Sequence, residues 1–518
     1  MHGRMRLQRV GPVLMACLLL TPAAGCGVRG LRRMAVTPHE LAAVPRRNTT
    51  LKAHLHDGSM LVFSGWRLDE QSRIVSGQAR RLDWNRDTGP DVEQSVALDS
   101  VALFESDELT IPGPMVAITV MTAIHAGLTG FCVSYPKACF GSCPTFYAWD
   151  GERQALMAEG FSASVAPALE ASDLDALDRA RPRGDRLTLT LTNEALETHV
   201  VRFADVLVAP RPAGGRVLAS ADGVMWSTTD WRTPDAAVGG EGDCRVLLAA
   251  RDLSERTSLA DSTDLAARET IELRFDHLRG GPLGLAITAR QSLLSTYIFY
   301  QTLAWMGRSA GNWLASLGRT DANALARVKA PATLLGGIEV QVEQHGEWVS
   351  AGAFKETGPL ASDTRLIALP NVSEGPLHVR LSLTRGLWRV DQVALVAVGE
   401  RVEPVRLKPA RVLRHGVPDA SALACLIGQA GPLVTQPGDT LSIEYVLPPA
   451  AGDAPELFLH SRGYYLEWMR EGWIAEENPE RLARLFLAPS ASLREMAPEF
   501  KRLEPGMESA FWGSRYAR

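Results

Sequence analysis

Alternating apolar and polar positions recur along the chain and predict a mainly β protein with some α structure. Two such runs flank Asp57-Gly58 in the sequence LKAHLHDGSMLVFSGW, and this dipeptide is typical of tight hairpin turns. Further strand-like runs follow at 73–82 and 94–104. We therefore expect a small antiparallel β module over residues 51–110.

Two longer segments, 186–208 and 378–398, share one pattern. Each has an alternating strand that ends in Leu-Thr, a short polar link and a second strand with one aspartate, Asp205 or Asp391. Strands with one apolar and one polar face are typical of antiparallel sheets packed on one side. The pattern predicts a multi-domain protein with β-sandwich-like modules at residues 136–289, which are rich in cysteine, and 333–448.

Helical periodicity replaces alternation in two regions. Residues 290–332 are expected to form a long central helix, because 290–319 contain no proline and place Leu294, Ile298 and Trp305 on one face. Residues 449–518 are expected to form a helical tail. In this tail Asn478 caps a helix that Pro479 begins, and an earlier helix packs Tyr464 and Tyr465 beside Trp468 in the core.

Residues 111–135 form an apolar helical segment in this interpretation. Twenty successive residues, 115–134, carry no formal charge, which makes them long enough to cross a bilayer. Threonines, glycines and His125 dilute the apolar character and make insertion less favourable. We therefore favour a docked helix, and contact with a membrane stays the alternative.

The N-terminus has the order of features of a secretory signal peptide. Arg4, Arg6 and Arg9 precede an apolar run at 10–20, and small residues follow. The apolar run is shorter than the roughly 20 residues that span a bilayer. Residues 1–25 are therefore expected to be removed on export.

The sequence Ala23-Ala24-Gly25-Cys26 resembles the lipobox of bacterial lipoproteins, although that family prefers leucine where Ala23 stands. The resemblance implies cleavage before Cys26 and a thioether-linked diacylglycerol on this cysteine. Gly27 replaces the aspartate that retains family members in the inner membrane, which points to the outer membrane. Residues 26–50 are basic and are expected to be a flexible lipidated tether beside lipid head groups. Ordinary secretion stays the alternative.

Composition narrows the partners and the chemistry. The 518-residue chain is 46% hydrophobic and has a net charge of −5, so it lacks the basic surface expected of a nucleic-acid-binding protein. In an oxidising compartment we expect one disulfide among Cys132, Cys139 and Cys143. The alternative is a metal site, but the C-x6-C-x3-C spacing differs from that of zinc sites, so we predict no metal or other cofactor.

Two short motifs resemble those of uncharacterised β-rich envelope proteins. They are Ser142-Cys143-Pro144 and Trp149-Asp150-Gly151. The resemblance implies a β-rich surface lipoprotein and names no activity.

Four groups of residues carry possible chemistry, and each has a plainer interpretation. Gly307-Arg308-Ser309-Ala310-Gly311 matches the G-x-S-x-G elbow of hydrolases, but its helical flanks favour a small-residue packing face. His54 and His56 could supply two ligands to a metal ion, which is fewer than a metal site needs. The simpler expectation is that both are exposed histidines on a strand.

The other two groups are acidic. Carboxylates near the cysteine-rich loop would suit glycoside hydrolysis only if two of them lay on either side of one bound sugar. The plainer interpretation is that Asp173 and Asp175 begin a helix. A polar link between strands is a candidate calcium or ligand-binding loop. The acids are Glu152, Glu159, Glu170, Asp173 and Asp175, and the link holds Asn193, Glu194, Glu197 and His199.

These observations favour a membrane-anchored envelope lipoprotein with a binding or assembly role, and we predict no catalytic residues. Its partners would be the membrane, through the lipid, and an envelope protein or glycan. One alternative is a hydrolase of cell-envelope glycan that uses the acids above. Another is an accessory subunit of a secretion or transport complex, with residues 115–134 as an exposed apolar patch.

Overall fold

The computed structural model describes residues 30–45, 50–83, 87–110, 143–278, 281–311, 313, 334–355, 358–370, 374–449 and 454–513. The expected signal peptide, Cys26, the apolar segment at 111–135, Cys132 and Cys139 lie outside these ranges. Within them the chain is mainly β with several sheets and a C-terminal helical stretch, which confirms the predicted fold class. No helix of the described ranges is both long and apolar enough to cross a membrane.

The N-terminal module is one antiparallel sheet in the order β1-β6-β2-β3-β4-β5. The hairpin at Asp57-Gly58 is confirmed, because β2 and β3 pair on either side of it and Gly58 has a φ of +77°. The strands are β1 (Gly30–Val36), β2 (Leu51–Leu55), β3 (Met60–Asp69), β4 (Ile74–Leu82), β5 (Thr88–Ala97) and β6 (Val101–Thr110), with the short helices η1 (Leu41–Ala43) and η2 (Leu98–Ser100).

Part of the expected flexible tether is ordered. β1 pairs along all seven of its residues with β6, and Val36 and Leu41 are buried. The unpaired backbone of an exposed sheet edge favours an added strand, which local composition does not reveal. Part of the segment 26–50, for which no regular structure was expected, is therefore a strand of this sheet.

The middle of the molecule is a sandwich of two sheets, in the orders β25-β24-β27-β10-β7-β8 and β23-β11-β28-β9, with β26 also on β11. Side chains of both sheets form one core, which includes Phe146, Leu189, Val206 and Leu459. The strands are β7 (Thr145–Trp149), β8 (Gln154–Glu159), β9 (Ala171–Ala176), β10 (Arg186–Thr192), β11 (Glu197–Ala209), β23 (Val405–Leu407), β24 (Arg411–Arg414), β25 (Val417–Pro418), β26 (Leu433–Thr435), β27 (Thr440–Val446) and β28 (Glu456–Glu467), with the helices η3 (Pro167–Leu169) and α7 (Ala420–Leu426).

The second β unit, which we call the lower unit, is built between β11 and β23. It combines a closed barrel, β12-β13-β22-β17-β20, with a sheet in the order β15-β14-β16-β21-β18-β19. The elements are β12 (Arg216–Ser220), β13 (Met225–Arg232), β14 (Ala236–Gly239), β15 (Gly242–Asp243), η4 (Val246–Leu248), β16 (Arg268–Leu278), β17 (Leu283–Gln291), β18 (Ile338–Gln344), β19 (Glu347–Phe354), β20 (Asp363–Ala368), β21 (Gly375–Thr384) and β22 (Trp388–Val402).

The two segments with a shared pattern each form two successive strands, β10 then β11 and β21 then β22, and Asp205 and Asp391 are buried on the second strand of each. In both pairs the two strands lie in different sheets. The expected segments at 136–289, 333–448 and 449–518 also contribute to common sheets, since β10 pairs with β27 and β11 pairs with β28. The sandwich therefore closes only when the chain returns from the lower unit.

The helices cover one end of the lower unit and differ from expectation at two points. The central helix, α4 (Leu294–Met306), begins after Arg290 because β17 continues to Gln291. The tail begins with a strand, β28, so the helix predicted around Tyr464 and Tyr465 is wrong. Pairing of β28 with β11 satisfies the backbone of both tyrosines in the sheet, which outweighs their helical spacing.

Three helices follow β28 and complete this layer. They are α8 (Glu471–Ala475), α9 (Pro479–Leu487) and α10 (Pro489–Gly513), and η5 (Gly307–Ser309) extends α4. The predicted cap is confirmed, because the Asn478 side chain accepts a hydrogen bond from the Arg481 backbone N–H and Pro479 is the first helical residue. α10 contributes Phe500 and Phe511 to the core of the lower unit.

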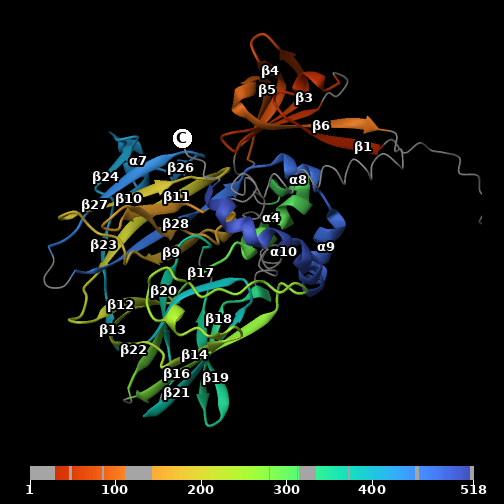
Figure 1. Cartoon of the computed structure of the whole chain (residues 1–518). Helices are drawn as coiled ribbons and strands as arrows, with labels where there is room; N and C mark the ends of the chain where they lie inside the picture. The colour runs from red at the N-terminus through yellow and green to blue at the C-terminus, as the bar shows by residue number, and fades with distance from the viewer. Residues whose placement is uncertain are drawn as a thin grey trace, which may run out of the picture.

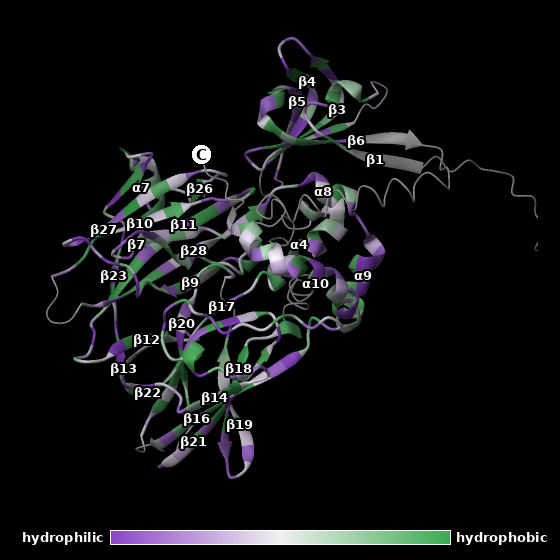
Figure 2. Ribbon diagram, viewed as in Figure 1, coloured by the Kyte–Doolittle hydropathy of each residue, from purple (hydrophilic) through white to green (hydrophobic). Residues whose placement is uncertain are grey.

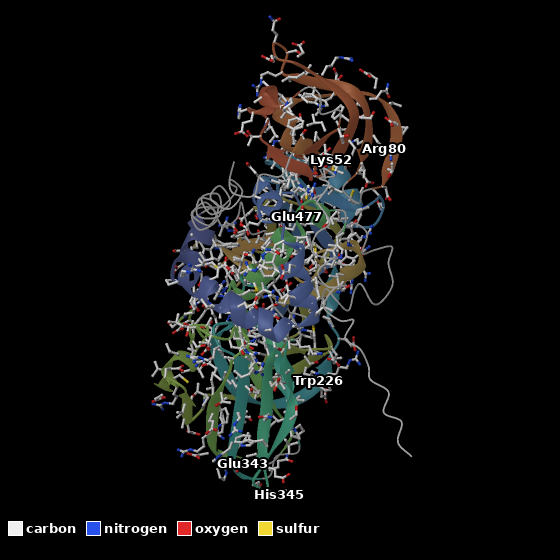
Figure 3. The ribbon with its side chains drawn as sticks, turned by 90° about the vertical axis from the view of Figure 1, so that its right-hand side faces the viewer. Lys52, Arg80, Trp226, Glu343, His345 and Glu477 are labelled. Atoms are coloured by element: carbon white, nitrogen blue, oxygen red, sulfur yellow. The ribbon has the colours of Figure 1, made fainter. Side chains whose placement is uncertain are left out.

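The figures show these units as successive tiers. The N-terminal module lies above α8 and α4, the sandwich beside the helices, and the lower unit at the opposite end (Figure 1). Apolar and polar residues alternate along many strands (Figure 2). In the side view, Lys52 and Arg80 mark one end, Glu477 the helical tier, and Glu343 and His345 the far hairpin (Figure 3).

Candidate binding site

A cavity of about 350 Å³ lies where the sandwich, the lower unit and α10 meet. We call it the arginine pocket. Long-range packing brings its wall together from six parts of the chain. The wall includes Tyr147, Arg153 and Gln154 of the β7–β8 hairpin, Arg179 after β9, Glu255, Arg290 of β17, Ser362 before β20, and Trp512 of α10.

The loop before β20 is fixed by a carboxylate of the sandwich. Glu159, at the end of β8, is buried and accepts hydrogen bonds from the backbone N–H groups of Leu360 (2.5 Å) and Ala361 (2.9 Å). Gly358 approaches this carboxylate so closely that a Cβ atom there would collide with it. Glu159 therefore holds one wall of the pocket in place.

A second wall depends on Arg290. Its Nε and Nη2 atoms contact the two oxygens of Glu255 at 2.6 and 2.7 Å, and Nη2 also contacts Glu508 Oε1 at 2.6 Å. Its Nη1 donates to the carbonyl of Pro359 at 2.7 Å. Burial disfavours the charge, but the two carboxylates outweigh it and raise the pKa of Arg290. This guanidinium is fully engaged and serves as a structural part of the wall.

Arg179 and Arg153 differ from Arg290 in lacking a carboxylate partner. Arg179 is half-buried and donates from Nη2 to the carbonyl of Leu156 at 2.7 Å. Burial lowers its pKa from the usual arginine value, although the side chain stays charged at neutral pH. Among the described residues, neither arginine has an acidic oxygen within ion-pair distance. The described lining of the pocket holds three arginines and one carboxylate, while Asp150 and Asp391 act on Arg179 from farther away.

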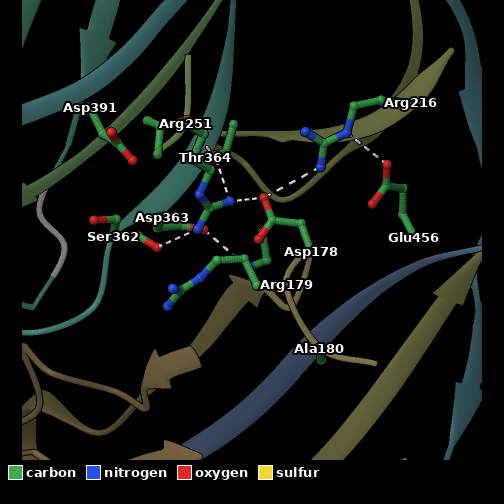
Figure 4. Close-up of polar contacts among 12 residues, drawn as sticks. Asp178, Arg179, Ala180, Arg216, Arg251, Ser362, Asp363, Thr364, Asp391 and Glu456 are labelled. Atoms are coloured by element: carbon green, nitrogen blue, oxygen red, sulfur yellow. Dashed lines mark hydrogen bonds and ion pairs between the residues drawn. The ribbon is translucent and has the colours of Figure 1, made fainter. Parts of the chain in front are cut away.

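The residue before Arg179 explains how this arginine is positioned. Asp178 turns into the protein, where it forms ion pairs with Arg251 and with Arg216 Nη2 at 3.4 Å. Arg216 also contacts Glu456 at 2.9 Å. Figure 4 shows this network and the Arg179 guanidinium extending away from it. The buried aspartate anchors the loop while the next residue points to the pocket.

Tyr147 is oriented by a residue that the sequence placed in a candidate calcium loop. Its hydroxyl donates to Glu194 Oε1 at 2.9 Å. In the same loop, the Asn193 side chain donates to the backbone carbonyls of Glu197 (2.9 Å) and Thr435 (3.2 Å). The described residues contain no group of three or more acids, histidines or cysteines arranged to hold a metal. The loop residues that we considered for calcium therefore brace the sandwich and, through Tyr147, the pocket.

The other two residues of that loop belong to β11 and are fully buried. His199 Nε2 lies 2.7 Å from Glu197 Oε1. Nearby, Glu467 accepts a hydrogen bond from the Tyr300 hydroxyl and forms an ion pair with Arg470 Nη2 at 2.6 Å. Burial raises the pKa of Glu467 to about 8. Arg470 opposes this shift, and Glu197 adds to it. We call these five residues the sealed cluster.

The acids considered for hydrolysis do not meet in the described lining of the arginine pocket. Glu159, Asp173 and Asp175 lie close enough to one another to raise the pKa of Asp175, but all three are engaged inside the fold. Glu152 is exposed on a turn, and Glu170 pairs with Arg202 and Arg462. Glu255, the single carboxylate of the described pocket wall, is held by Arg290. Glycoside hydrolysis by two carboxylates needs one that is protonated and one that is free to act on the opposite side of the bond. The described pocket supplies no such pair.

Asp173 and Asp175 begin no helix, so that prediction is wrong. Both lie on β9, which pairs with β28, and this long-range pairing outweighs the local resemblance to a cap. Burial, with Asp363 nearby, raises the pKa of both carboxyls, most strongly for Asp175. Arg365 opposes the effect.

The G-x-S-x-G sequence has no strand before it. It follows α4, the Ser309 hydroxyl donates to the Met306 carbonyl at 2.7 Å, and Gly307 packs against the side chain of Glu477. The packing interpretation is therefore confirmed at Gly307. Arg308 reinforces the contact with an ion pair to Glu477 at 2.9 Å.

The two histidines considered as metal ligands differ in burial and in position. Only His54 lies on β2, where it is buried and contacts Glu105 Oε1 at 3.1 Å, so the expectation of an exposed ring is wrong there. His56 follows the strand, is exposed and has its ring centroid 5.8 Å from that of Trp468. These contacts connect the N-terminal module internally and to the rest of the protein.

The described residues include only part of the predicted disulfide cluster. Cys143, Cys244 and Cys425 are free thiols, and Cys143 is buried next to Tyr465 in a small apolar cluster. Burial raises the pKa of the Cys143 thiol well above its usual value, which disfavours a reactive thiolate. Cys132 and Cys139 lie outside the described residues, so the predicted bridge within this trio stays a prediction.

Sequence reasoning missed the arginines of the pocket. One signal was present, since four arginines fall within residues 179–186 directly after the acidic sequence DLDALD. A basic loop after a strand is a reasonable place to look for an anion site. No local signal connects this loop with Arg153 or Trp512, which come from distant parts of the chain.

The similarity of this chain to the two solved structures named below is distant. Neither a scan against protein-family models nor a search of curated proteins finds a match. Among solved structures, TmCBM61 in complex with β-1,4-galactotriose is 11% identical, with a TM-score of 0.14 over 37% of this chain and 86% of that one. Dimeric latent PorU from Porphyromonas gingivalis is 10% identical, with a TM-score of 0.15 over 84% of this chain and 31% of that one.

The present chain thus spans about a third of the length of that PorU structure. TM-scores of 0.14 and 0.15 establish no common fold with either protein.

Proposed function

We propose that this protein is exported, anchored by lipid on Cys26 in the cell envelope at the outer membrane, and binds a saccharide of the envelope in the arginine pocket. The binding role rests on one observation, which is that the half-buried guanidinium of Arg179 lines a cavity and has no carboxylate within ion-pair distance among the described residues. Aromatic rings and hydrogen-bonding side chains on the same wall suit a saccharide ring and its hydroxyls.

The volume of the pocket supports a small unit as the ligand. About 350 Å³ lies at the lower end of the range of ligand pockets and suits one or two sugar residues better than a protein domain. Hydrolysis is the less favoured role, since Glu255 is already paired with Arg290. The role of accessory subunit depended on 115–134, which lie outside the described residues.

A blocking substitution tests the binding role. Gln154 lines the pocket from an exposed position, so Gln154→Trp should fill the cavity with little effect on the fold. Glu152→Trp is the matched control, because Glu152 is exposed on the same hairpin and does not line the pocket. Saturation-transfer NMR with soluble fragments of envelope glycan should detect binding to the wild type and the control only. Equal binding by all three proteins would contradict the proposed site.

The anchor is tested separately by Cys26→Ser. The wild type should fractionate with membranes and carry the mass of a diacylglycerol on its mature N-terminus, whereas the variant should do neither. Equal membrane association and equal processed mass of both forms would contradict lipidation at Cys26.

A further inference from the structure

The charges of the pocket wall do not cancel. The lining holds Arg153, Arg179 and Arg290 and one carboxylate, Glu255, which pairs with Arg290, as Glu508 outside the lining also does. Charged groups that are withdrawn from water without a partner are costly, and proteins usually compensate them with an opposite charge. Within the described chain, Arg179 donates a hydrogen bond to a backbone carbonyl and has no carboxylate within ion-pair distance, while Asp150 and Asp391 act on it from farther away. A negative charge in direct contact with its guanidinium can therefore come from a ligand.

The guanidinium of Arg179 is positioned so that it can bind a ligand. Asp178 anchors its backbone through Arg216 and Arg251, so the loop is fixed while the guanidinium is not bound by that aspartate. One of its Nη atoms donates to Leu156, and the remaining donors of the planar fork are available to an anion. Arg153 lines the same cavity from an exposed turn and adds a second positive charge.

We propose that the ligand of the arginine pocket is an anionic saccharide, whose carboxylate or phosphate is bound by Arg179 and Arg153 while its ring lies against Tyr147 or Trp512. This inference rests on the proposed binding function and adds the charge of the ligand to it. A planar guanidinium fork matches carboxylate and phosphate groups equally well, so the two sources of negative charge share one recognition chemistry.

The test separates the charge of the ligand from the existence of the site. Envelope glycan fragments are divided by anion exchange into a neutral and an acidic pool, and each is titrated against the wild type and Arg179→Gln. Glucuronic acid, glucose 6-phosphate and glucose serve as defined probes. Arg183→Gln is the matched control, since Arg183 lies on the same loop, contacts the Trp149 ring and does not line the pocket.

We expect the acidic pool to bind the wild type and Arg183→Gln, with an affinity about 10- to 100-fold lower for Arg179→Gln, the size of one charge-assisted hydrogen-bond pair. Arg179→Lys should restore only part of this affinity, because a lysine lacks the planar fork. Binding should also weaken with added salt, less steeply in Arg179→Gln. Loss of binding after phosphatase treatment would identify phosphate, and its retention would identify carboxylate.

The contrary outcomes are distinct. Binding of the neutral pool or glucose as tightly as the acidic ligands would overturn the anionic inference and leave the proposed function standing. Binding of neither pool would overturn both. Equal binding of the acidic pool by Arg179→Gln and the wild type, with Gln154→Trp inactive, would place the anion elsewhere in the pocket and overturn the role of Arg179. Unchanged thermal unfolding of the variants shows that they are folded.

Discussion

The arginine pocket and the sealed cluster both contain an arginine that is partly or fully removed from water, but the groups that contact the arginine differ. In the sealed cluster, Arg470 contacts Glu467 at 2.6 Å and both side chains are almost fully buried. In the pocket, Arg179 is half-buried and contacts a carbonyl in place of a carboxylate. The comparison suggests that the first arrangement serves the fold, because its partners are internal. The second leaves room for a partner from outside.

The largest expected effect breaks the sealed cluster. At pH 9, where Glu467 is ionised, Arg470→Met should remove the cation that faces it and lower the free energy of unfolding by about 3–5 kcal/mol, as is typical when one partner of a buried pair is lost. The loss should be greater at pH 9 than at pH 6, because Glu467 is neutral at the lower pH. Urea unfolding at both pH values measures it.

Arg481→Met is the control for this substitution. Arg470 lies over the indole ring of Trp473, and Arg481 lies over that of Trp305. The Arg481 side chain, however, is about one-third exposed and its ion pair with Glu499 spans 3.5 Å. Its loss should reduce stability by about 1 kcal/mol or less. Equal effects of the two substitutions would contradict a structural role specific to the sealed cluster.

The second largest effect on stability is expected at Asp178, which anchors the loop that carries Arg179. Asp178→Asn should weaken the ion pairs with Arg216 and Arg251 and lower the free energy of unfolding by about 2 kcal/mol. Asp185→Asn, at an exposed position of the same loop, should change it little. If the two variants have the same unfolding midpoint in urea, Asp178 does not fix the loop.

The pH dependence of stability sharpens the comparison. Because the pKa of Glu467 is about 8 in the folded protein and near 4.5 in the unfolded chain, the folded state binds the extra proton between these values. Its contribution is complete below pH 4.5 and is lost as the pH rises toward 8, at up to ~1.4 kcal/mol per pH unit. Glu467→Gln should flatten the profile of unfolding free energy from pH 5 to pH 8. A profile parallel to that of the wild type would show that Glu467 is already ionised in this range.

The smallest expected effect is on the stability of a pocket variant. Arg179→Gln should change the free energy of unfolding by no more than about 0.5 kcal/mol, since it removes no ion pair among the described residues. Chemical denaturation of Arg179→Gln and Arg470→Met under the same conditions compares the two losses directly. A loss of several kcal/mol would indicate that Arg179, like Arg470, serves the fold.

The features that sequence patterns predicted are those that a few neighbouring residues determine. Asp57-Gly58 makes its own turn, and Asn478 caps the helix that begins one residue later. Tyr464 and Asp173 were misassigned because they lie on the paired strands β28 and β9, where partners remote in sequence override helical spacing and cap-like composition.

The pocket was beyond sequence reasoning for the same reason. Arg153, Arg179 and Trp512 come together only after the sandwich, the lower unit and α10 have assembled. The burial of Glu197 and His199 likewise depends on β28, which pairs with β11 from more than 250 residues away. Local composition marks these residues as polar and does not distinguish a loop site from a sealed interior.

Protection of individual arginines by ligand tests the central claim most directly. The wild type is treated with phenylglyoxal, which modifies arginine side chains, with and without the acidic glycan pool, and modified positions are located by peptide mass spectrometry. The account predicts that the pool slows modification of Arg179 and Arg153 and leaves Arg183 unaffected. Bound ligand with unchanged rates at Arg179 and Arg153 would contradict the claim that the arginine pocket binds an anionic saccharide.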